Sequence, residues 1–206
     1  MKSKYFTKFC GITRLQDALN AQEAGCNSLG FVFVKASKRY IEPSQCSEII
    51  NEVSPLIVTV ALFANNAKEE IESILSQCSI QVLQFHGSES GEFCQQFKRP
   101  YWKAIPMADA IDPVKYAQKH PNALGYVIDN YGQKQQGGSG VKFDWNELPK
   151  KLGNKWILAG GLTVDNIKEA RQNSSLRSFD VSSGIEVSPG IKSKQKMNQF
   201  IKNLND

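Results

Sequence analysis

The chain has 206 residues, of which 41% are apolar and 22% charged, so it is long enough to bury a core without disulfides or metal clips. Its formal net charge of +5 comes from basic residues scattered along the whole chain. This distribution argues against a nucleic-acid-binding arm and favours a solvated basic surface. No apolar run approaches the ~18 residues of a membrane span, and the first residues contain no signal-peptide core.

The cysteines are odd in number and contain no C-x-x-C pair. They are Cys10, Cys26, Cys46, Cys78 and Cys94. Such a set predicts reduced thiols in a cytoplasmic protein, without a zinc site.

Short β-rich runs alternate with segments of helical periodicity along the first half of the chain. Strands are expected at 5–10, 28–34, 56–64 and 82–87, and helices within 14–25, 43–53, 67–78 and 90–98. Thr13 and Gln16 suggest a capping box for the first helix, which Gly25 would end. Two helices show one apolar face each, formed by Cys46, Ile49, Ile50 and Val53, and by Ile71, Ile74, Leu75 and Cys78.

The second half continues the same alternation. Strands are expected at 101–107, 124–130, 155–161 and 179–186, and helices at 112–120, 143–152, 163–174 and 193–205. Pro113 suits a first helical turn. Met197, Phe200, Ile201 and Leu204 share one face of the last helix. The Gly- and Gln-rich loop at 131–142 lacks the lysine of a P-loop, and we interpret it either as a lid or as a surface connection.

About eight β-then-α units follow one another with almost continuously apolar strands. This pattern predicts parallel strands joined by crossover helices. An open doubly wound sheet is one solution, but no G-x-G-x-x-G follows the first strand, and a leucine-rich solenoid lacks its consensus. The sequence favours a (β/α)8 TIM barrel formed as one domain by residues 1–206.

In such a barrel the functional groups lie where strands end and in the loops that follow. This rule selects Cys10, Arg39, His86, Asp129, Gly160, Gly161, Asp180, Ser182, Ser183 and Gly184. The glycines and serines after the seventh and eighth strands suit a phosphate, because backbone N–H groups can approach an anion closely there.

Each of these residues also has an ordinary structural interpretation. A single cysteine such as Cys10 is usually a small buried packing residue. An aspartate at the position of Asp129 is usually a helix cap, and Arg39 would be an ordinary surface residue. His86 fits a packed rim histidine as well as a substrate-binding one. Asp180 could position Cys10 or a water molecule, and we expect His120 to be structural.

The motifs taken together resemble phosphoribosylanthranilate isomerase over residues 6–204. The resemblance is carried by KFCGITRLQDA, LGFVF…SKRYI, QFHGSES, KAI, VIDNYG…GGSGVKFDW, LAGGLTVDN and FDVSSGIEVSPGIK. It implies a (β/α)8 barrel without cofactor or metal that acts in tryptophan biosynthesis. The implied reaction is an Amadori rearrangement of N-(5-phosphoribosyl)anthranilate to 1-(2-carboxyphenylamino)-1-deoxyribulose 5-phosphate.

The resemblance also implies roles for individual residues. Cys10 would be the general base and Asp129 the general acid, while Arg39 would hold the anthranilate carboxylate. The glycines of AGGL and the backbone of SSG would bind the phosphate. Asn130 departs from the Thr or Ser expected beside the acid.

The chemistry sets requirements for the acid and the base. Asp129 must hold a proton to open the furanose ring, and Cys10 must act as a thiolate to remove the proton from C2. We therefore expect that the pKa of Cys10 is lowered or that its proton is handed off. Lys8, two residues away on the same strand, should share the face of Cys10 and assist.

Two other functions compete with this one. Another sugar-phosphate barrel, such as an indole-glycerol-phosphate synthase or an epimerase, would need a lysine and glutamate set or metal-binding histidines at the strand ends. A catalytically inactive domain that only binds a phosphorylated metabolite would need neither a general acid nor a general base. The expected partner is a small phosphorylated substrate rather than nucleic acid or membrane, and the chain could be a monomer or a homodimer.

Overall fold

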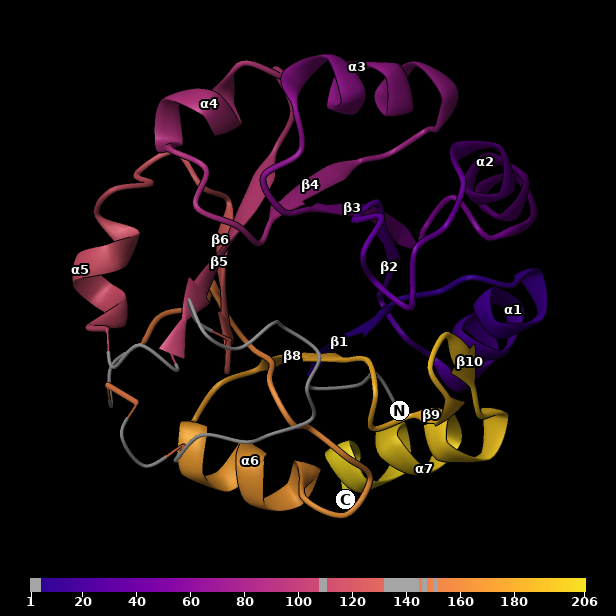
Figure 1. Ribbon diagram of the computed structural model, residues 1–206. Helices are drawn as coiled ribbons and strands as arrows, with labels where there is room; N and C mark the ends of the chain where they lie inside the picture. Colours follow the sequence, from indigo (N-terminus) through magenta and orange to yellow (C-terminus); the bar gives the residue numbers. More distant parts are fainter. Residues whose placement is uncertain (1–4, 108–110, 132–144, 146–147, 150–151) are drawn as a thin grey trace.

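The computed structural model describes residues 5–107, 111–131, 145, 148–149 and 152–206, and it contains a closed eight-stranded barrel. Neighbouring strands pair in parallel in the order β1 to β8, and β8 pairs with β1 to close the barrel (Figure 1). The predicted TIM barrel is therefore confirmed. The strands are β1 Phe6–Cys10, β2 Ser28–Val32, β3 Val58–Phe63, β4 Val82–Phe85, β5 Tyr101–Pro106, β6 Gly125–Asp129, β7 Trp156–Leu158 and β8 Ser178–Val181.

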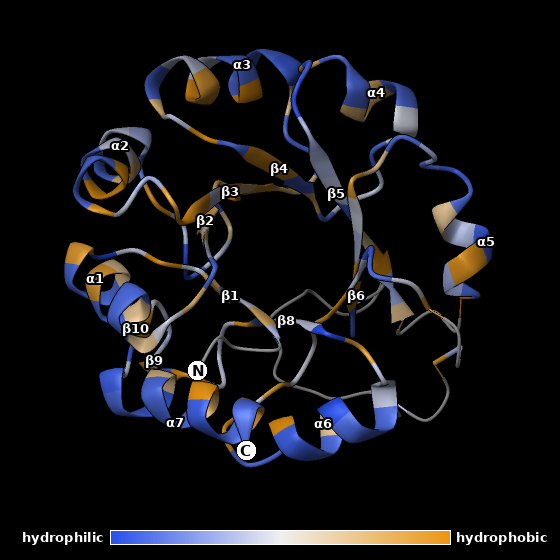
Figure 2. Cartoon of the chain, turned by 180° about the vertical axis from the view of Figure 1, so that it is seen from behind, coloured by the Kyte–Doolittle hydropathy of each residue, from blue (hydrophilic) through white to orange (hydrophobic). Residues whose placement is uncertain are grey.

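Helices surround the barrel and follow the strands in chain order (Figure 1). They carry hydrophilic as well as hydrophobic residues, whereas β3 and β4 are mainly hydrophobic (Figure 2). The helices are α1 Leu15–Ala24, α2 Pro43–Glu52, α3 Lys68–Gln77, α4 Gly91–Gln95, α5 Pro113–Ala117, α6 Ile167–Ser174 and α7 Lys194–Asn205. Most of the predicted helix at 143–152 and nearly all of the predicted loop at 131–142 lie outside the described residues.

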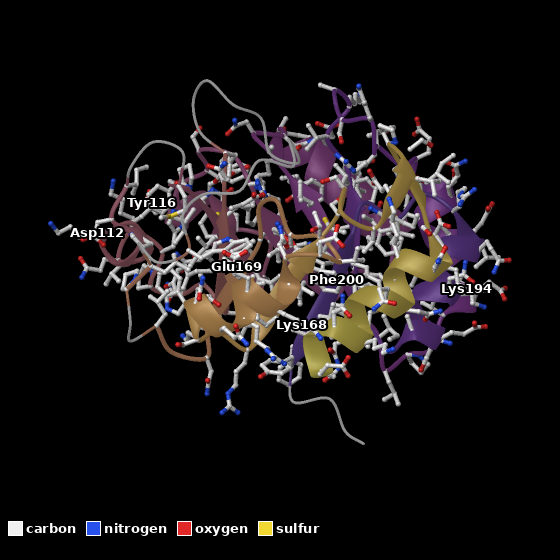
Figure 3. The ribbon with its side chains drawn as sticks, turned by 90° about the horizontal axis from the view of Figure 1, so that it is seen from below. Asp112, Tyr116, Lys168, Glu169, Lys194 and Phe200 are labelled. Carbon is white, nitrogen blue, oxygen red and sulfur yellow. The ribbon has the colours of Figure 1, made fainter. Side chains whose placement is uncertain are left out.

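The predicted apolar helix faces are the faces that pack inward. On α7, Met197, Phe200 and Leu204 are fully buried. Phe200 (Figure 3) packs edge-on against Phe9 of β1, with ring centroids 6.1 Å apart. Burial of these side chains stabilises the helix layer on the barrel, because each large apolar side chain removed from water contributes about 1.5–3 kcal/mol.

The two ends of α1 differ in how well the sequence predicted them. Gly25 ends the helix in the left-handed conformation, with φ of 91°, as predicted. The predicted capping box is wrong, because Arg14 is the N-cap and makes no side-chain capping bond. Thr13 instead donates its hydroxyl hydrogen bond to the carbonyl of Gly190. A contact between distant segments has replaced the local cap.

A small antiparallel hairpin lies between β8 and α7 and was not predicted. It consists of β9 Glu186–Ser188 and β10 Ile191–Lys192. The hairpin lies beside α1 and α7 in both ribbon views (Figures 1 and 2). It thereby brings Glu186 and Lys192 next to the loop that follows β8.

The described residues contain no helix that is both long and apolar enough to cross a membrane.

Candidate active site

The strands that carry the predicted catalytic pair end on the same rim of the barrel. Cys10 is the last residue of β1 and Asp129 the last residue of β6. Because all eight strands are parallel, their C-terminal ends share one end of the barrel. The loops that carry His86, Gly160, Gly161 and the Ser182–Gly184 segment start from this same end.

Cys10 lies inside the barrel beside an ion pair. Lys8 Nζ is 2.7 Å from Asp180 Oδ2, and both side chains are buried. Lys8 and Cys10 both face Gly30, where a Cβ would lie 2.9 Å from Lys8 Cε and 2.8 Å from Cys10 Sγ. The predicted shared face of Lys8 and Cys10 is therefore confirmed, and Asp180 reaches Cys10 through Lys8.

The pKa of the Cys10 thiol is raised, mainly because burial disfavours the thiolate. The Lys8 ammonium opposes this effect, and the Asp180 carboxylate adds to it. Burial alone would lower the pKa of Lys8, but Asp180 and Cys10 hold it above its ordinary value. The expectation of a lowered thiol pKa is therefore wrong for the free protein.

Asp129 lies against His86 and the loop after β7. His86 Nε2 is 3.2 Å from Asp129 Oδ2, an ion-pair distance without the alignment of a hydrogen bond. On the other side of the ring, the amide nitrogen of Gln84 lies 3.1 Å from His86 Nδ1. His86 also packs against Tyr131, with ring centroids 4.4 Å apart and the ring planes tilted by 41°. The His86 ring thus lies between the Gln84 amide and the predicted acid.

Two left-handed glycines form the turn after β7. Gly160 and Gly161 have φ values of 77° and 69°. A Cβ on Gly160 would lie 2.8 Å from Asp129 Oδ1. Asn166 donates to the carbonyl of Gly161 and accepts from the backbone N–H of Thr163, both at 2.8 Å. The turn therefore packs on Asp129 and leads into α6.

The loop after β8 docks on the loop after β7. Gly184 forms a parallel bridge with Thr163. A Cβ on Gly184 would overlap the carbonyl oxygen of Leu162, so only glycine fits there. Ser182 Oγ donates to the carbonyl of Cys10 at 3.0 Å, and the Ser183 carbonyl accepts from the N–H of Glu186 at 3.0 Å. The two predicted phosphate loops are thus adjacent, and one of them is bonded to β1, the strand that ends at Cys10.

Arg39 lies over the turn that follows Cys10. A Cβ on Gly11 would lie 2.5 Å from Arg39 Cδ. The guanidinium makes two parallel bonds to Glu186, from Nε to Oε1 and from Nη2 to Oε2, both 2.8 Å long. Lys192 Nζ lies 2.8 Å from Glu186 Oε1 and also donates to the carbonyl of Ser182.

Sequence reasoning missed Glu186 and Lys192 as functional candidates. Glu186 belongs to the motif FDVSSGIEVSPGIK, but its partner Arg39 lies 147 residues away. No spacing rule connects two such residues. The only available signal was an acidic residue close to the predicted phosphate loop.

A second buried ion pair, also missed, holds the loop after β4. Lys103 Nζ lies 3.0 Å from Glu89 Oε2. The same ammonium donates to the carbonyls of Phe85 and Gly87, the residues on either side of His86. This pair fixes the backbone from which His86 reaches Asp129. Within the described ranges, no three His, Cys, Asp or Glu side chains are grouped so as to hold a metal ion.

Comparison with known proteins agrees with this geometry. The sequence profile described as N-(5'phosphoribosyl)anthranilate (PRA) isomerase matches residues 7–203. The N-(5'-phosphoribosyl)anthranilate isomerase of Hahella chejuensis is 42% identical over 194 residues, which are 94% of this chain and 91% of the relative.

Solved structures agree as well. The phosphoribosyl anthranilate isomerase of Thermotoga maritima superposes with a TM-score of 0.84 at 33% identity, covering 97% of this chain and 98% of that one. A phosphoribosyl anthranilate isomerase in complex with reduced 1-(o-carboxyphenylamino)-1-deoxyribulose 5-phosphate has a TM-score of 0.78 at 29% identity, with the same coverage. The chain therefore belongs to the N-(5'-phosphoribosyl)anthranilate isomerase family.

Proposed function

We propose that Cys10 and Asp129 are the base and the acid of this enzyme. The chain is an isomerase that acts on N-(5'-phosphoribosyl)anthranilate in tryptophan biosynthesis. The observation that carries the assignment of residues is the shared rim: the acid and the base end different strands of one parallel barrel, and the two phosphate loops lie between them.

The reaction needs one proton donor and one proton acceptor. Asp129 donates its proton to the furanose ring oxygen, the C–O bond breaks, and a protonated Schiff base forms. The Cys10 thiol releases its own proton to water once the cationic Schiff base is present, and the resulting thiolate removes the proton from C2. This gives an enolamine that tautomerises to the aminoketone. Each proton transfer by a positioned group typically contributes ~10²–10⁴-fold to the rate.

The thiolate forms only after the substrate is bound. In the free protein, burial raises the pKa of Cys10. The cationic Schiff base adds a positive charge to that of Lys8, and both favour the thiolate over the thiol. Asp180 fixes Lys8 through one carboxylate oxygen, while the other, Oδ1, has no hydrogen-bond partner within the described residues. We assign this oxygen to a hydroxyl group of the substrate.

The two ends of the substrate have separate anchors. Gly160, Gly161 and the Ser182–Gly184 segment would take the phosphate, because glycine turns let N–H groups approach an anion. Arg39 would take the anthranilate carboxylate. The solved relative in complex with a reduced deoxyribulose 5-phosphate derivative supports a ligand that carries both groups. The enzyme would work in the cytoplasm without a cofactor, as a single domain.

The test compares two variants by a fluorescence assay for the loss of freshly prepared N-(5'-phosphoribosyl)anthranilate. Cys10→Ala and Asp129→Asn should each lower kcat by ~10²–10⁴-fold. Both should still bind the reduced product analogue, because neither residue anchors the carboxylate or the phosphate. A Cys10→Ala protein with wild-type turnover would refute the assignment of the base. If the wild-type protein does not convert N-(5'-phosphoribosyl)anthranilate, it is a catalytically inactive binding domain instead.

A further inference from the structure

We propose that Glu186 is a positioning residue that holds Arg39 ready for the substrate's carboxylate and ties this anchor to the phosphate loop. The proposal rests on the proposed role of Arg39. It concerns a residue to which sequence reasoning assigned no function, and it gives the β9–β10 hairpin a place in substrate recognition.

First, Glu186 occupies only one edge of the Arg39 guanidinium. An arginine side chain has five N–H donors in a plane. Glu186 accepts from the Nε–H and from one N–H of Nη2, each at 2.8 Å. The three remaining donors lie on Nη1 and Nη2, and two of them form a second parallel fork. Arg39 can therefore bind a second carboxylate while Glu186 keeps the first fork.

The second step is the rigidity of this arrangement. The Glu186 side chain is 5% exposed, and that of Arg39 is 14% exposed. Beyond Arg39, Glu186 Oε1 accepts from Lys192 Nζ at 2.8 Å and from the N–H of Gly190 at 3.3 Å. The aliphatic stem of Arg39 lies on Gly11, whose φ is 74°. Both ends of the Arg39 side chain are therefore fixed before any ligand arrives.

The third step is the charge of the cluster. Arg39 carries one positive charge and Glu186 one negative charge. Burial lowers the pKa of Lys192, and Glu186 opposes this shift. With Lys192 protonated, the three side chains together carry one positive charge. The Glu186 carboxylate remains ionised because burial, which raises its pKa, is outweighed by Arg39 and Lys192, which lower it. One net positive charge matches one substrate carboxylate, so bound substrate would neutralise the cluster.

The fourth step is the link to the phosphate loop and the base. Lys192 Nζ donates to the carbonyl of Ser182 at 3.1 Å. Ser182 Oγ in turn donates to the carbonyl of Cys10. A continuous set of bonds therefore joins the carboxylate anchor, the phosphate loop and the strand of the base. This network sets the spacing between the two ends of the substrate.

The opposite role for Glu186 is that of a competitor. In that case Glu186 would occupy the fork that the substrate needs, and Arg39 would have to leave it upon binding. The two roles predict opposite effects when the Glu186 charge is removed. Loss of a positioning group weakens recognition of the carboxylate, whereas loss of a competitor strengthens it.

The experiment measures how strongly each variant recognises the carboxylate. Calorimetry gives the Kd of the reduced product analogue and of its anilino counterpart, which lacks only the carboxylate. The ratio of the two Kd values isolates the carboxylate contact, and a general structural defect changes both alike. The wild type should prefer the carboxylate ligand by roughly 10- to 100-fold, as expected for hydrogen bonds to a charged group.

The variants should separate as follows. Glu186→Gln should reduce the preference to about 3-fold or less, and should change the Kd of the anilino ligand by less than about 3-fold. Arg39→Lys should also lose the preference, because lysine cannot form the fork.

The matched control is Glu89→Gln, which removes the charge from another buried ion pair, on the loop after β4. It should keep the wild-type preference. If Glu186→Gln does not fold, Glu186→Asp keeps the charge but is too short to bond both guanidinium nitrogens, and it should reduce the preference as well.

Each remaining outcome has a definite meaning. If the wild type shows no preference, or Arg39→Lys retains it, the proposed role of Arg39 fails and the role of Glu186 fails with it. If only the Arg39 variant loses the preference while Glu186→Gln keeps it, the Glu186 proposal alone is overturned. An increased preference in Glu186→Gln would identify a competitor.

Discussion

Lys8 and Asp180 act on Cys10 in opposite directions. The ammonium of Lys8 favours a thiolate, while burial and the Asp180 carboxylate disfavour it, and the pKa of the thiol is raised as a result. The ion pair therefore lowers the cost of a buried thiolate without creating one in the free enzyme. Such an arrangement keeps the thiol in its neutral form until substrate supplies a further positive charge.

This balance predicts how the thiol titrates. In the free protein, Cys10 should form its thiolate with a midpoint above the ordinary ~8.5. Lys8→Met should move this midpoint upward by about one unit or more, because an opposite charge is lost. The titration is followed by thiolate absorbance at 240 nm, as the difference between each protein and its Cys10→Ser counterpart.

The double variant Lys8→Met/Asp180→Asn is the control for that titration. It removes the carboxylate together with the ammonium, so its midpoint should lie below that of Lys8→Met alone. A wild-type midpoint below pH 8 would show that burial does not dominate the pKa of this thiol.

Sequence reasoning found the strand-end residues and Lys8 beside Cys10, but it did not find partners that lie on distant segments. Cys10, Asp129 and Asp180 could be selected because they fall at or near the ends of apolar runs, and parallel strands bring such ends together. Glu186 and Lys103 could not, because their contacts join segments that only the closed barrel brings together. The same fact explains the raised pKa of Cys10, which depends on burial that the sequence does not reveal.

At the scale of elements, the eight strands were predictable and the hairpin was not. Most barrel strands are largely apolar runs bounded by turn residues, a pattern set by burial on both faces. The strands of the hairpin, Glu186–Ser188 and Ile191–Lys192, have three and two residues. Runs this short show no periodicity. Thr13 was assigned to a cap for the same reason, since its actual partner, Gly190, belongs to that hairpin.

The docking of the β7 and β8 loops gives a prediction at this scale. Gly184→Ala places a Cβ on the Leu162 carbonyl oxygen, so the two loops must separate. We expect a loss of about 1–3 kcal/mol in the free energy of unfolding. We also expect weaker binding of the reduced product analogue, because both loops are proposed to hold its phosphate. Urea unfolding and calorimetry measure the two effects.

Gly153→Ala is the matched control, because nothing lies within 4 Å of a Cβ at that position. It should change neither the stability nor the affinity by more than the experimental error. If Gly184→Ala is as stable as Gly153→Ala and binds the analogue as tightly, the two loops are not coupled.

At the scale of the whole molecule, the stability of the fold should depend on pH through a group far from the chemistry. His120 is buried near the end of α5, stacked on Tyr116 with ring centroids 5.9 Å apart. Burial lowers its pKa to about 4, and the nearby Lys103 ammonium acts in the same direction. The imidazole therefore stays neutral in the folded protein at pH values where it would be protonated in the unfolded chain.

The sign of the effect follows from these two pKa values. The unfolded imidazole has a pKa of ~6.5, so between pH 6.5 and about 4 only the unfolded chain binds the proton. Folding stability is therefore lost as the pH falls through this window, and is unaffected by His120 above it. His120→Phe keeps an aromatic ring in place and removes the titration. Its loss of stability between pH 7 and pH 4.5 should be smaller than that of the wild type by about 2 kcal/mol.

Urea unfolding at several pH values measures this difference. Buried carboxylates such as Glu186 destabilise both proteins alike in acid, so the difference between the two curves isolates His120. At pH 7.5 the pH-dependent contribution of His120 vanishes, and the difference measured there serves as the baseline for packing. Parallel stability curves from pH 7 to pH 4.5 would show that His120 is protonated equally in the folded and unfolded states, in conflict with its burial.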